Sequence, residues 1–287
     1  MLSGARRCAV LGSPVRHSLS PVLHRAAYDE LGLDWSYGTV EMEVDGLPTF
    51  LDSLDPSWRG LSLTMPLKRA VVPLLDEVTD RVRMAGAANT VVLEDGRRVG
   101  DNTDVPGAAA ALTERWDGPV ERAVVLGGGA TAASVLLALA GLGCRSATLL
   151  VRDPARAADT VAAVRRHPRP PELRVERLGE ATTGEVDVLV STVPAAAQDA
   201  EALRLARAAG VVFEVLYDPW PTPLAAAAEA AGQPLVGGLD LLVHQAVMQV
   251  RLMTGVATAP LAAMRAAGEA ALAARWGEPP SGGGPVA

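Results

Sequence analysis

A lysine that follows a short predicted strand is the first residue that could carry chemistry. In residues 60–68, leucines alternate with serine and threonine, and this period of two predicts a half-buried strand. Pro66 ends the strand because proline has no N–H for the ladder. Lys68 follows the strand end, where open α/β folds place their chemistry. The alternative is a solvated lysine beside a helix predicted over residues 69–75.

Two serines precede the first predicted helix. Ser20 followed by Pro21 is typical of a helix start, with Ser20 as the N-cap, and Gly32 is predicted to end the helix. Ser18 and Ser20 could instead hold a small polyol or a carboxylate, because free N–H groups and the helix dipole favour an anion there. Capping alone remains the alternative for Ser20.

Short polar residues gather beside small ones in two later segments. They are Asn89 in the first and Asn102, Thr103 and Asp104 in the second. Asparagine and aspartate favour turns, and turn formation explains Asp95 well. It explains Asn89, which lies in an otherwise apolar run, less well.

A glycine loop follows a predicted buried strand over residues 121–126. Residues 127–130 are three glycines and an alanine, and an apolar helix over residues 132–142 comes next. Glycines let the turn close and let a pyrophosphate approach the backbone at the helix N-terminus. A second strand over residues 146–151 has the spacing of a βαβ unit, which favours dinucleotide binding over a turn that merely packs.

The end of that second strand bears on the type of dinucleotide. An acidic residue there binds the ribose 2′-hydroxyl of NAD, whereas an arginine accepts the 2′-phosphate of NADP. Arg152 and Asp153 are both present, so the residues alone leave the choice open. Further strands are predicted over residues 186–191 and 211–216, and Tyr217 follows the second.

The composition excludes several classes of protein. The net charge of −7 over 287 residues argues against a nucleic-acid partner, and 49% hydrophobic but only 3% aromatic residues predict a core of alanine, leucine and valine. No apolar run is long enough to span a membrane, and no signal peptide or metal-binding motif is found. Cys8 and Cys144 are expected to be buried thiols of a reducing compartment, so we expect a cytoplasmic protein. Residues 277–287 are expected to be a disordered tail.

Strands and helices alternate through the first part of the chain. Strands are predicted over residues 7–12 and 35–40, and helices over residues 46–54 and 76–85. A further strand that begins near Asn89 turns back after residues 94–96. This pattern predicts an α/β protein with a parallel sheet.

Taken together, these motifs resemble those of the shikimate dehydrogenase family. The matching segments, in chain order, are residues 17–21 (HSLSP), 63–68 (LTMPLK), 86–90 (GAANT), 101–104 (DNTD), 217–219 (YDP) and 238–246 (GLDLLVHQA). The resemblance covers nearly the whole chain apart from the tail.

The resemblance implies reversible reduction of 3-dehydroshikimate to shikimate with NADPH. It implies an α/β substrate domain of residues 1–104, completed by helices in residues 241–276, and a Rossmann-type NADP-binding domain of residues 105–240. The implied catalytic pair is Lys68 and Asp104, and the implied substrate-binding residues are Ser18, Ser20, Thr64, Asn89, Tyr217 and Gln245. The implied cofactor-binding residues are Gly127, Gly128, Gly129, Ala130, Arg152, Asp80, Val215 and Gly238.

These residue types suit the implied chemistry. Hydride passes between the nicotinamide and a ring carbon, so the carbonyl oxygen must gain or lose a proton, and a lysine can transfer it. The dinucleotide carries the redox step, so no metal is needed. The partners implied are the small-molecule substrate and, as one possible assembly, a homodimer, with no nucleic acid or membrane.

The chain departs from the family pattern at four positions. Ser62 replaces the usual asparagine, Ala130 a glycine and Leu241 a methionine. Asp153 stands beside the retained Arg152, where it could repel a 2′-phosphate. Two alternatives therefore stay open: an NAD-dependent enzyme acting on quinate, supported only by Asp153, and a non-catalytic ligand-binding relative.

Overall fold

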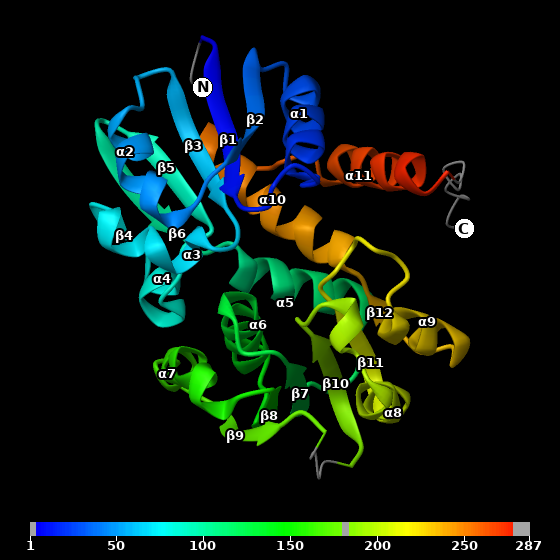
Figure 1. Ribbon diagram of the computed structural model, residues 1–287. Helices are drawn as coiled ribbons and strands as arrows, with labels where there is room; N and C mark the ends of the chain where they lie inside the picture. The colour runs from blue at the N-terminus through cyan, green and yellow to red at the C-terminus, as the bar shows by residue number, and fades with distance from the viewer. Residues whose placement is uncertain (1–3, 180–183, 278–287) are drawn as a thin grey trace.

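The computed structural model describes residues 4–179 and 184–277, which form two sheets with helices around each (Figure 1). The predicted disordered tail lies outside the described residues except for Gly277. Within the described part of the chain, every helix is too short or too polar to cross a bilayer.

The upper half in Figure 1 contains a six-stranded mixed sheet. Its strand order is β2 (Trp35–Glu41), β1 (Arg6–Gly12), β3 (Trp58–Leu63), β5 (Thr90–Glu94), β6 (Arg97–Asp101) and β4 (Glu77–Val78). The parallel pairing predicted for the first three strands is confirmed. β5 pairs antiparallel with β3 and forms a hairpin with β6, whose turn residues Asp95 and Gly96 both have positive φ.

The helices of the upper half are short. They are α1 (Ser20–Glu30), η1 (Val44–Gly46), α2 (Leu47–Asp52), α3 (Leu67–Ala70), η2 (Val72–Leu74) and α4 (Asp80–Ala85). The single helix predicted over residues 69–75 is wrong. Pro73 has no N–H to continue the α-helical hydrogen bonds, so α3 ends at Ala70 and the chain goes on as the short 3-10 helix η2, which contains Pro73. The helix predicted over residues 76–85 begins only at Asp80, since residues 77–78 pair with β6 as β4.

The lower half contains a wholly parallel six-stranded sheet. Its order is β12 (Leu235–Val236), β11 (Ala209–Glu214), β10 (Val186–Ser191), β7 (Arg122–Leu126), β8 (Ser146–Val151) and β9 (Glu172–Arg177). Numbered within this half and read from β9, the order is 3-2-1-4-5-6, the order of doubly wound dinucleotide-binding folds. Its helices are α6 (Ala130–Gly141), η3 (Pro154–Ala157), α7 (Ala158–Arg165), η4 (Ala195–Ala197), α8 (Ala200–Ala208) and α9 (Pro223–Ala230).

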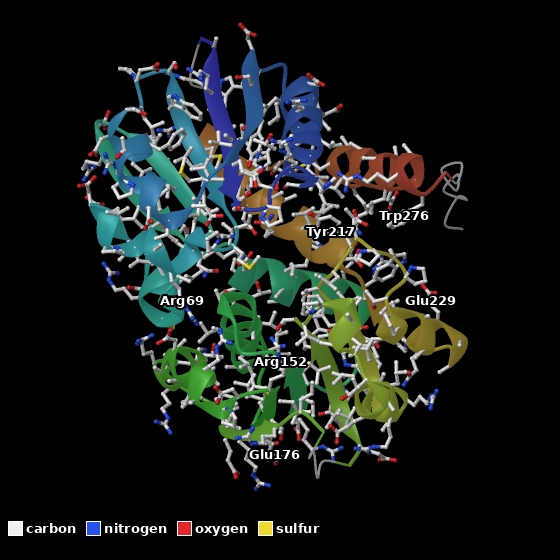
Figure 2. All side chains as sticks on the ribbon, in the orientation of Figure 1. Arg69, Arg152, Glu176, Tyr217, Glu229 and Trp276 are labelled. Carbon is white, nitrogen blue, oxygen red and sulfur yellow. The ribbon has the colours of Figure 1, made fainter. Side chains whose placement is uncertain are left out.

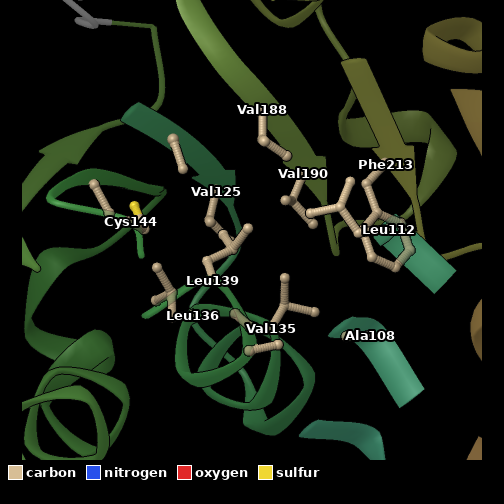
Figure 3. Packing of buried hydrophobic residues seen from close by; sticks show 14 of the residues in the cluster. Ala108, Leu112, Val125, Val135, Leu136, Leu139, Cys144, Val188, Val190 and Phe213 are labelled. Carbon is tan, nitrogen blue, oxygen red and sulfur yellow. The ribbon is translucent and has the colours of Figure 1, made fainter. Parts of the chain in front are cut away.

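Small and branched residues form the core of the lower half, as the composition predicts. Figure 3 shows Leu136 and Leu139 of α6 facing Val125 of β7 and Val190 of β10, and all four are fully or almost fully buried. Alanines at half of the other positions of α6 let the helix lie close to the sheet. This packing fixes the start of α6 against the ends of the central strands.

Three long helices connect the halves. They are α5 (Asp104–Arg115), α10 (Gly238–Thr254) and α11 (Leu261–Trp276). α5 packs against both α6 and α10, and α11 packs against α1, so the C-terminal helices return to the upper half (Figure 1). Residues that follow β3, begin α5 and lie along α10 thereby meet between the two sheets.

A fully buried histidine lies under this junction. The Nε2 atom of His24 is 3.2 Å from Oε1 of Gln249, and its ring stacks on Tyr37 with 4.0 Å between centroids. Burial lowers the pKa of His24 to about 4, and the hydrogen bond to Gln249 opposes that shift only partly. Between pH 6.5 and about 4, the imidazole of His24 is therefore neutral in the folded protein but protonated in the unfolded chain.

Replacing His24 by glutamine is expected to flatten the acid dependence of stability. Between pH 6.5 and 4 the unfolded state binds the proton and the folded state does not, so stability falls as the pH falls. His24 should contribute a loss of about 2 kcal/mol between pH 8 and pH 5. Urea unfolding at both pH values measures this difference, with His17→Gln, an exposed histidine, as the control. Equal pH slopes for wild type and His24→Gln would contradict the assignment.

Candidate active site

A cavity of about 660 Å³ lies where the two halves meet. All eight residues predicted to bind substrate or to act in catalysis line it: Ser18, Ser20, Thr64, Lys68, Asn89, Asp104, Tyr217 and Gln245. They come from the loop after β1 and the start of α1, from the residues that follow β3 and precede β5, from α3 and α5, from the loop after β11 and from α10. The tertiary structure thus collects segments that are up to 227 residues apart, from residue 18 to residue 245, around one space.

An ion pair forms the polar centre of this cavity. The Nζ atom of Lys68 in α3 donates to Oδ2 of Asp104, the first residue of α5, at 2.6 Å. The two side chains are only 15% and 8% exposed. The helix N-terminus favours the carboxylate, and the carboxylate in turn orients the ammonium.

Lys68 is also the only lysine in the sequence, since 25 of the 26 basic residues are arginines. An arginine stays protonated at any physiological pH, whereas a lysine can give up its proton. The chain has arginine at every other Lys or Arg position and lysine only at position 68, as expected if this position transfers protons. This count is a signal in the sequence beyond the motifs themselves.

Asn89 holds the acidic partner of the pair in place. Its Nδ2 atom lies 2.8 Å from Oδ1 of Asp104, 2.9 Å from Oγ1 of Thr103 and 3.0 Å from Oε1 of Gln245. Its Oδ1 accepts from the backbone N–H of Thr103 at 2.8 Å. The side chain is 2% exposed, so turn formation alone does not account for it. Asn89, which directly precedes β5, therefore connects the end of β3 to the start of α5 and to the middle of α10.

The serines before α1 are arranged differently from the capping prediction. Ser20 is the first residue of α1, and its side chain makes no capping hydrogen bond; the backbone N–H of Ser20 donates to Oγ of Ser18 at 3.2 Å. The predicted N-cap role of Ser20 is therefore wrong. The Ser18 hydroxyl in turn donates to Oγ of Ser20 at 3.2 Å. Two adjacent hydroxyls face the cavity, an arrangement that suits a ligand with oxygen atoms.

Tyr217 closes another wall of the cavity from the loop after β11. Burial raises the pKa of Tyr217, against hydrogen bonds to the Leu19 backbone and to Ser18, so the phenol keeps its proton and can donate. A buried carboxylate supports this loop: Glu214 accepts from the backbone N–H of Leu216 at 3.0 Å and from Oγ1 of Thr222 at 2.9 Å. Burial raises the pKa of Glu214 above its ordinary value.

A second cavity, of about 580 Å³, lies over the glycine loop. Gly127 has φ of +100°, and a Cβ there would lie 2.4 Å from Oγ1 of Thr192, so this position requires glycine. At Gly129 a Cβ would meet nothing within 4 Å, so the backbone faces open space. α6 begins directly after the loop with no side-chain cap on its first N–H groups. This open backbone at a helix N-terminus fits a pyrophosphate.

The far end of the second cavity is basic. It is lined by Arg152 and by Arg156, which the sequence reasoning missed. Among the described residues, neither guanidinium has an ion-pair partner. Asp153 also lines the cavity, but its Oδ1 accepts from the backbone N–H of Ala155 at 3.0 Å and caps η3. Two arginines beside an engaged carboxylate fit a 2′-phosphate better than a bare ribose hydroxyl.

Four predicted cofactor positions lie elsewhere. Val215 and Gly238 line the first cavity instead, and Ala130 is the first residue of α6 and lines neither. Gly238 must be a glycine, because a Cβ would lie 2.4 Å from the backbone carbon of Leu216. Asp80 also lines neither cavity: its side chain is 90% exposed and pairs with Arg83 at 2.7 Å. This exposed position gives the predicted cofactor role of Asp80 no support, and the role stays a prediction.

Several cavity residues escaped the sequence reasoning. Besides Arg156 they include His17, Ser62, Met65, Thr131, Leu242 and Gln249 in the first cavity and Arg69 in the second. Ser62 and Gln249 belong to a buried network, in which Oγ of Ser62 donates to Oε1 of Gln249 at 2.9 Å. Among the described residues, no group of three or more potential metal ligands is arranged around a common point.

Comparison with known proteins agrees with this architecture. Residues 10–91 match the model of the shikimate dehydrogenase substrate binding domain, and residues 238–267 match that of the shikimate 5′-dehydrogenase C-terminal domain. The chain is 35% identical over 285 residues to shikimate dehydrogenase (NADP(+)) of Moorella thermoacetica, with 96% of each protein covered. The chain belongs to the shikimate dehydrogenase family. The predicted resemblance is thereby confirmed.

Solved structures of the shikimate dehydrogenase family support the fold as well. The crystal structure of Mycobacterium tuberculosis shikimate dehydrogenase is 40% identical and superimposes with a TM-score of 0.83, covering 94% of this chain and 99% of that one. A quinate dehydrogenase from Corynebacterium glutamicum, solved in complex with NAD, is 28% identical with a TM-score of 0.82 over 92% of this chain and 98% of that one. The α/β fold with a doubly wound second sheet is therefore shared across both activities.

Proposed function

We propose that this protein is an NADP-dependent shikimate dehydrogenase, which reversibly reduces 3-dehydroshikimate to shikimate in the synthesis of aromatic amino acids. The observation that carries the proposal is the buried pair of Lys68 and Asp104 in a cavity that is also lined by Thr131 of α6, the helix that follows the glycine loop. The NADP(+)-dependent relatives at about a third identity over nearly the whole chain support the choice of substrate and cofactor.

Lys68 and Asp104 are proposed to perform the proton transfer. The bound dinucleotide supplies or accepts the hydride. As the ring carbonyl becomes a hydroxyl, Nζ of Lys68 gives its proton to the carbonyl oxygen, and in the reverse direction it takes that proton back. Asp104 keeps the ammonium aimed at the cavity, since its Oδ2 accepts from Nζ at 2.6 Å while its Oδ1 is held by Asn89.

The remaining polar groups of the first cavity suit a polyhydroxylated carboxylic acid. Ser18, Ser20 and Tyr217 line one wall with hydroxyl groups that can bind a carboxylate. Asn89, Gln245 and Thr64 offer amide and hydroxyl groups to the ring hydroxyls. Each of these assignments is part of the proposal and rests on position and on chemical type.

The glycine loop and two arginines are proposed to hold NADP. Gly127, Gly128 and Gly129 would take the pyrophosphate, and Arg152 with Arg156 would pair with the 2′-phosphate. Val215 and Gly238 line the first cavity, where the substrate would bind. The nicotinamide must reach that substrate to exchange a hydride with it, so both residues would lie near the nicotinamide end of the dinucleotide.

Steady-state oxidation of shikimate and of quinate, each with NADP⁺ and with NAD⁺, tests the proposal through the absorbance of the reduced nicotinamide. We expect the highest kcat/KM for shikimate with NADP⁺. A preference for quinate with NAD⁺ would favour the second candidate, the catabolic activity, which Asp153 and the quinate dehydrogenase relative support. Tight ligand binding without turnover in any combination would indicate a non-catalytic relative.

Three further expectations stay predictions. The substrate domain would comprise residues 1–104 with residues 241–276, and the cofactor domain residues 105–240. The enzyme would work in the cytoplasm and could form a homodimer. Limited proteolysis, fractionation and light scattering measure these properties.

A further inference from the structure

One arginine of the upper half reaches into the cavity of the lower half. Arg69 belongs to α3 and directly follows Lys68, yet it lines the second cavity together with the glycine loop. Every other described residue that lines this cavity belongs to the lower half, between Gly127 and Ala197. In Figure 2, Arg69 lies at the margin of the upper half that faces the lower half with Arg152.

The present partners of Arg69 are weak ones. Its Nη1 lies 3.1 Å from Oδ2 of Asp159, and its Nη2 lies 3.4 Å from Oγ1 of Thr160. The ion pair is open to solvent, with Arg69 36% and Asp159 74% exposed. Such pairs contribute little to stability, so the guanidinium can exchange Asp159 for a better anion at low cost.

Thr160 brings Arg69 close to the phosphate-binding backbone. The Thr160 hydroxyl donates to the carbonyl oxygen of Gly128 at 2.7 Å, and Oγ1 of Thr160 itself accepts from Nη2 of Arg69. The guanidinium is therefore one hydroxyl group away from the glycine loop. A pyrophosphate over that loop would offer charged oxygens to an arginine that now has only a distant hydroxyl and an exposed carboxylate.

We propose that Arg69 binds the pyrophosphate of the dinucleotide across the cleft and leaves Asp159 when it does so. This inference rests on the proposed function, since it takes a dinucleotide as the ligand of the second cavity. Because Arg69 and Lys68 are neighbours in the same short helix, cofactor binding in the lower half would also fix the position of the catalytic ammonium in the upper half. Arg69 thus acts as a binding residue for the cofactor and as a positioning residue for Lys68.

The competing interpretation is a structural strap, in which Arg69 and Asp159 only hold the halves together. The two interpretations differ in what Asp159 does. If the two residues only hold the halves together, Asp159→Asn and Arg69→Gln should weaken NADP⁺ binding equally. For a phosphate ligand, Asp159→Asn removes a competing anion and should leave NADP⁺ binding unchanged or tighter, whereas Arg69→Gln should weaken it.

Isothermal titration of the full-length protein tests the proposal. We expect Arg69→Gln to raise the Kd for NADP⁺ about tenfold, and to leave the Kd for adenosine 2′-monophosphate, which has no pyrophosphate, unchanged. Arg166→Gln is the matched control, because Arg166 also crosses between the halves, to the backbone oxygen of Met84 at 3.0 Å, but does not line the cavity. It should bind NADP⁺ like wild type.

Two results would overturn the inference while leaving the proposed function intact: wild-type affinity in Arg69→Gln, or equal losses in Arg69→Gln and Asp159→Asn. A wild-type protein that does not bind NADP⁺ would overturn both. The kinetic signature is a raised KM for NADP⁺ with an unchanged KM for shikimate. Higher salt should narrow the difference between Arg69→Gln and wild type, since the interaction is between charges near the surface.

Discussion

Replacing Lys68 by methionine is expected to lower kcat by about 10²- to 10⁴-fold, the range found for a positioned general acid or base. Methionine keeps most of the length of the side chain but removes both the proton and the charge. Shikimate should still bind, because the hydroxyl and amide groups around the cavity remain. Steady-state rates together with a titration of shikimate binding separate the two effects.

The variant leaves Asp104 buried without its cation, so its fold needs a check. Asp104 is 6% exposed, and breaking one side of a buried pair destabilises a protein by about 3–5 kcal/mol. Lys68→Met with Asp104→Asn removes both charges and should recover stability but not turnover. Lys68→Arg, which keeps the charge but cannot give up a proton, should be nearly as slow as Lys68→Met. Turnover within a few-fold of wild type in Lys68→Met would remove Lys68 from the mechanism.

The single lysine also makes its ionisation directly measurable. With one lysine in 287 residues, a protein labelled in lysine gives one side-chain signal by NMR that needs no assignment. Following that signal against pH, with and without shikimate, reports the protonation state of the proposed acid. If the chemical shift and pH dependence of this signal did not change when shikimate is added, Lys68 would not act on the substrate.

Replacing Arg152 by alanine is expected to raise the KM for NADP⁺ by about 10- to 100-fold and to leave the KM for NAD⁺ nearly unchanged. Arg152 lines the second cavity without an ion-pair partner among the described residues, and hydrogen bonds between charged groups contribute about 1.5–3 kcal/mol. The two dinucleotides differ only in the 2′-phosphate, so a contact with that group must appear in one KM and not in the other. Initial rates with each dinucleotide measure it.

Two other variants help to interpret the kinetics of Arg152→Ala. Arg174→Ala removes an arginine of β9 that pairs with Glu172 and lines neither cavity, so its kinetics should equal those of wild type. Asp153→Ala removes the only carboxylate among the described residues that line the second cavity. This variant should raise the ratio of kcat/KM for NADP⁺ to kcat/KM for NAD⁺. If Arg152→Ala raised the KM for NADP⁺ and the KM for NAD⁺ equally, the substitution would act on the loop in general and not on recognition of the 2′-phosphate.

Local patterns in the sequence predict much of the fold because they record local physics. The buried strands around the glycine loop are visible as short apolar runs, and the loop itself as consecutive glycines before an apolar helix. The errors fall where a neighbour overrides local preference. β9 and β12 escaped notice because each is an edge strand, partly exposed or only two residues long, and pairing with the sheet defines it.

The sequence by itself determined the family, the α/β class and eight of the polar residues of the first cavity, since motif spacing and residue type carry that information. Only the tertiary structure decided which groups touch. It joined Lys68 to Asp104 over 36 positions of sequence, placed three acceptors around Nδ2 of Asn89 and made Asp153 the cap of a short helix. It also brought Arg69 and Arg156 to the second cavity and left Asp80 outside. The reason is physical: a motif records which side chains a site needs, whereas distances, burial and competing partners arise only when the two sheets and the helices between them pack together.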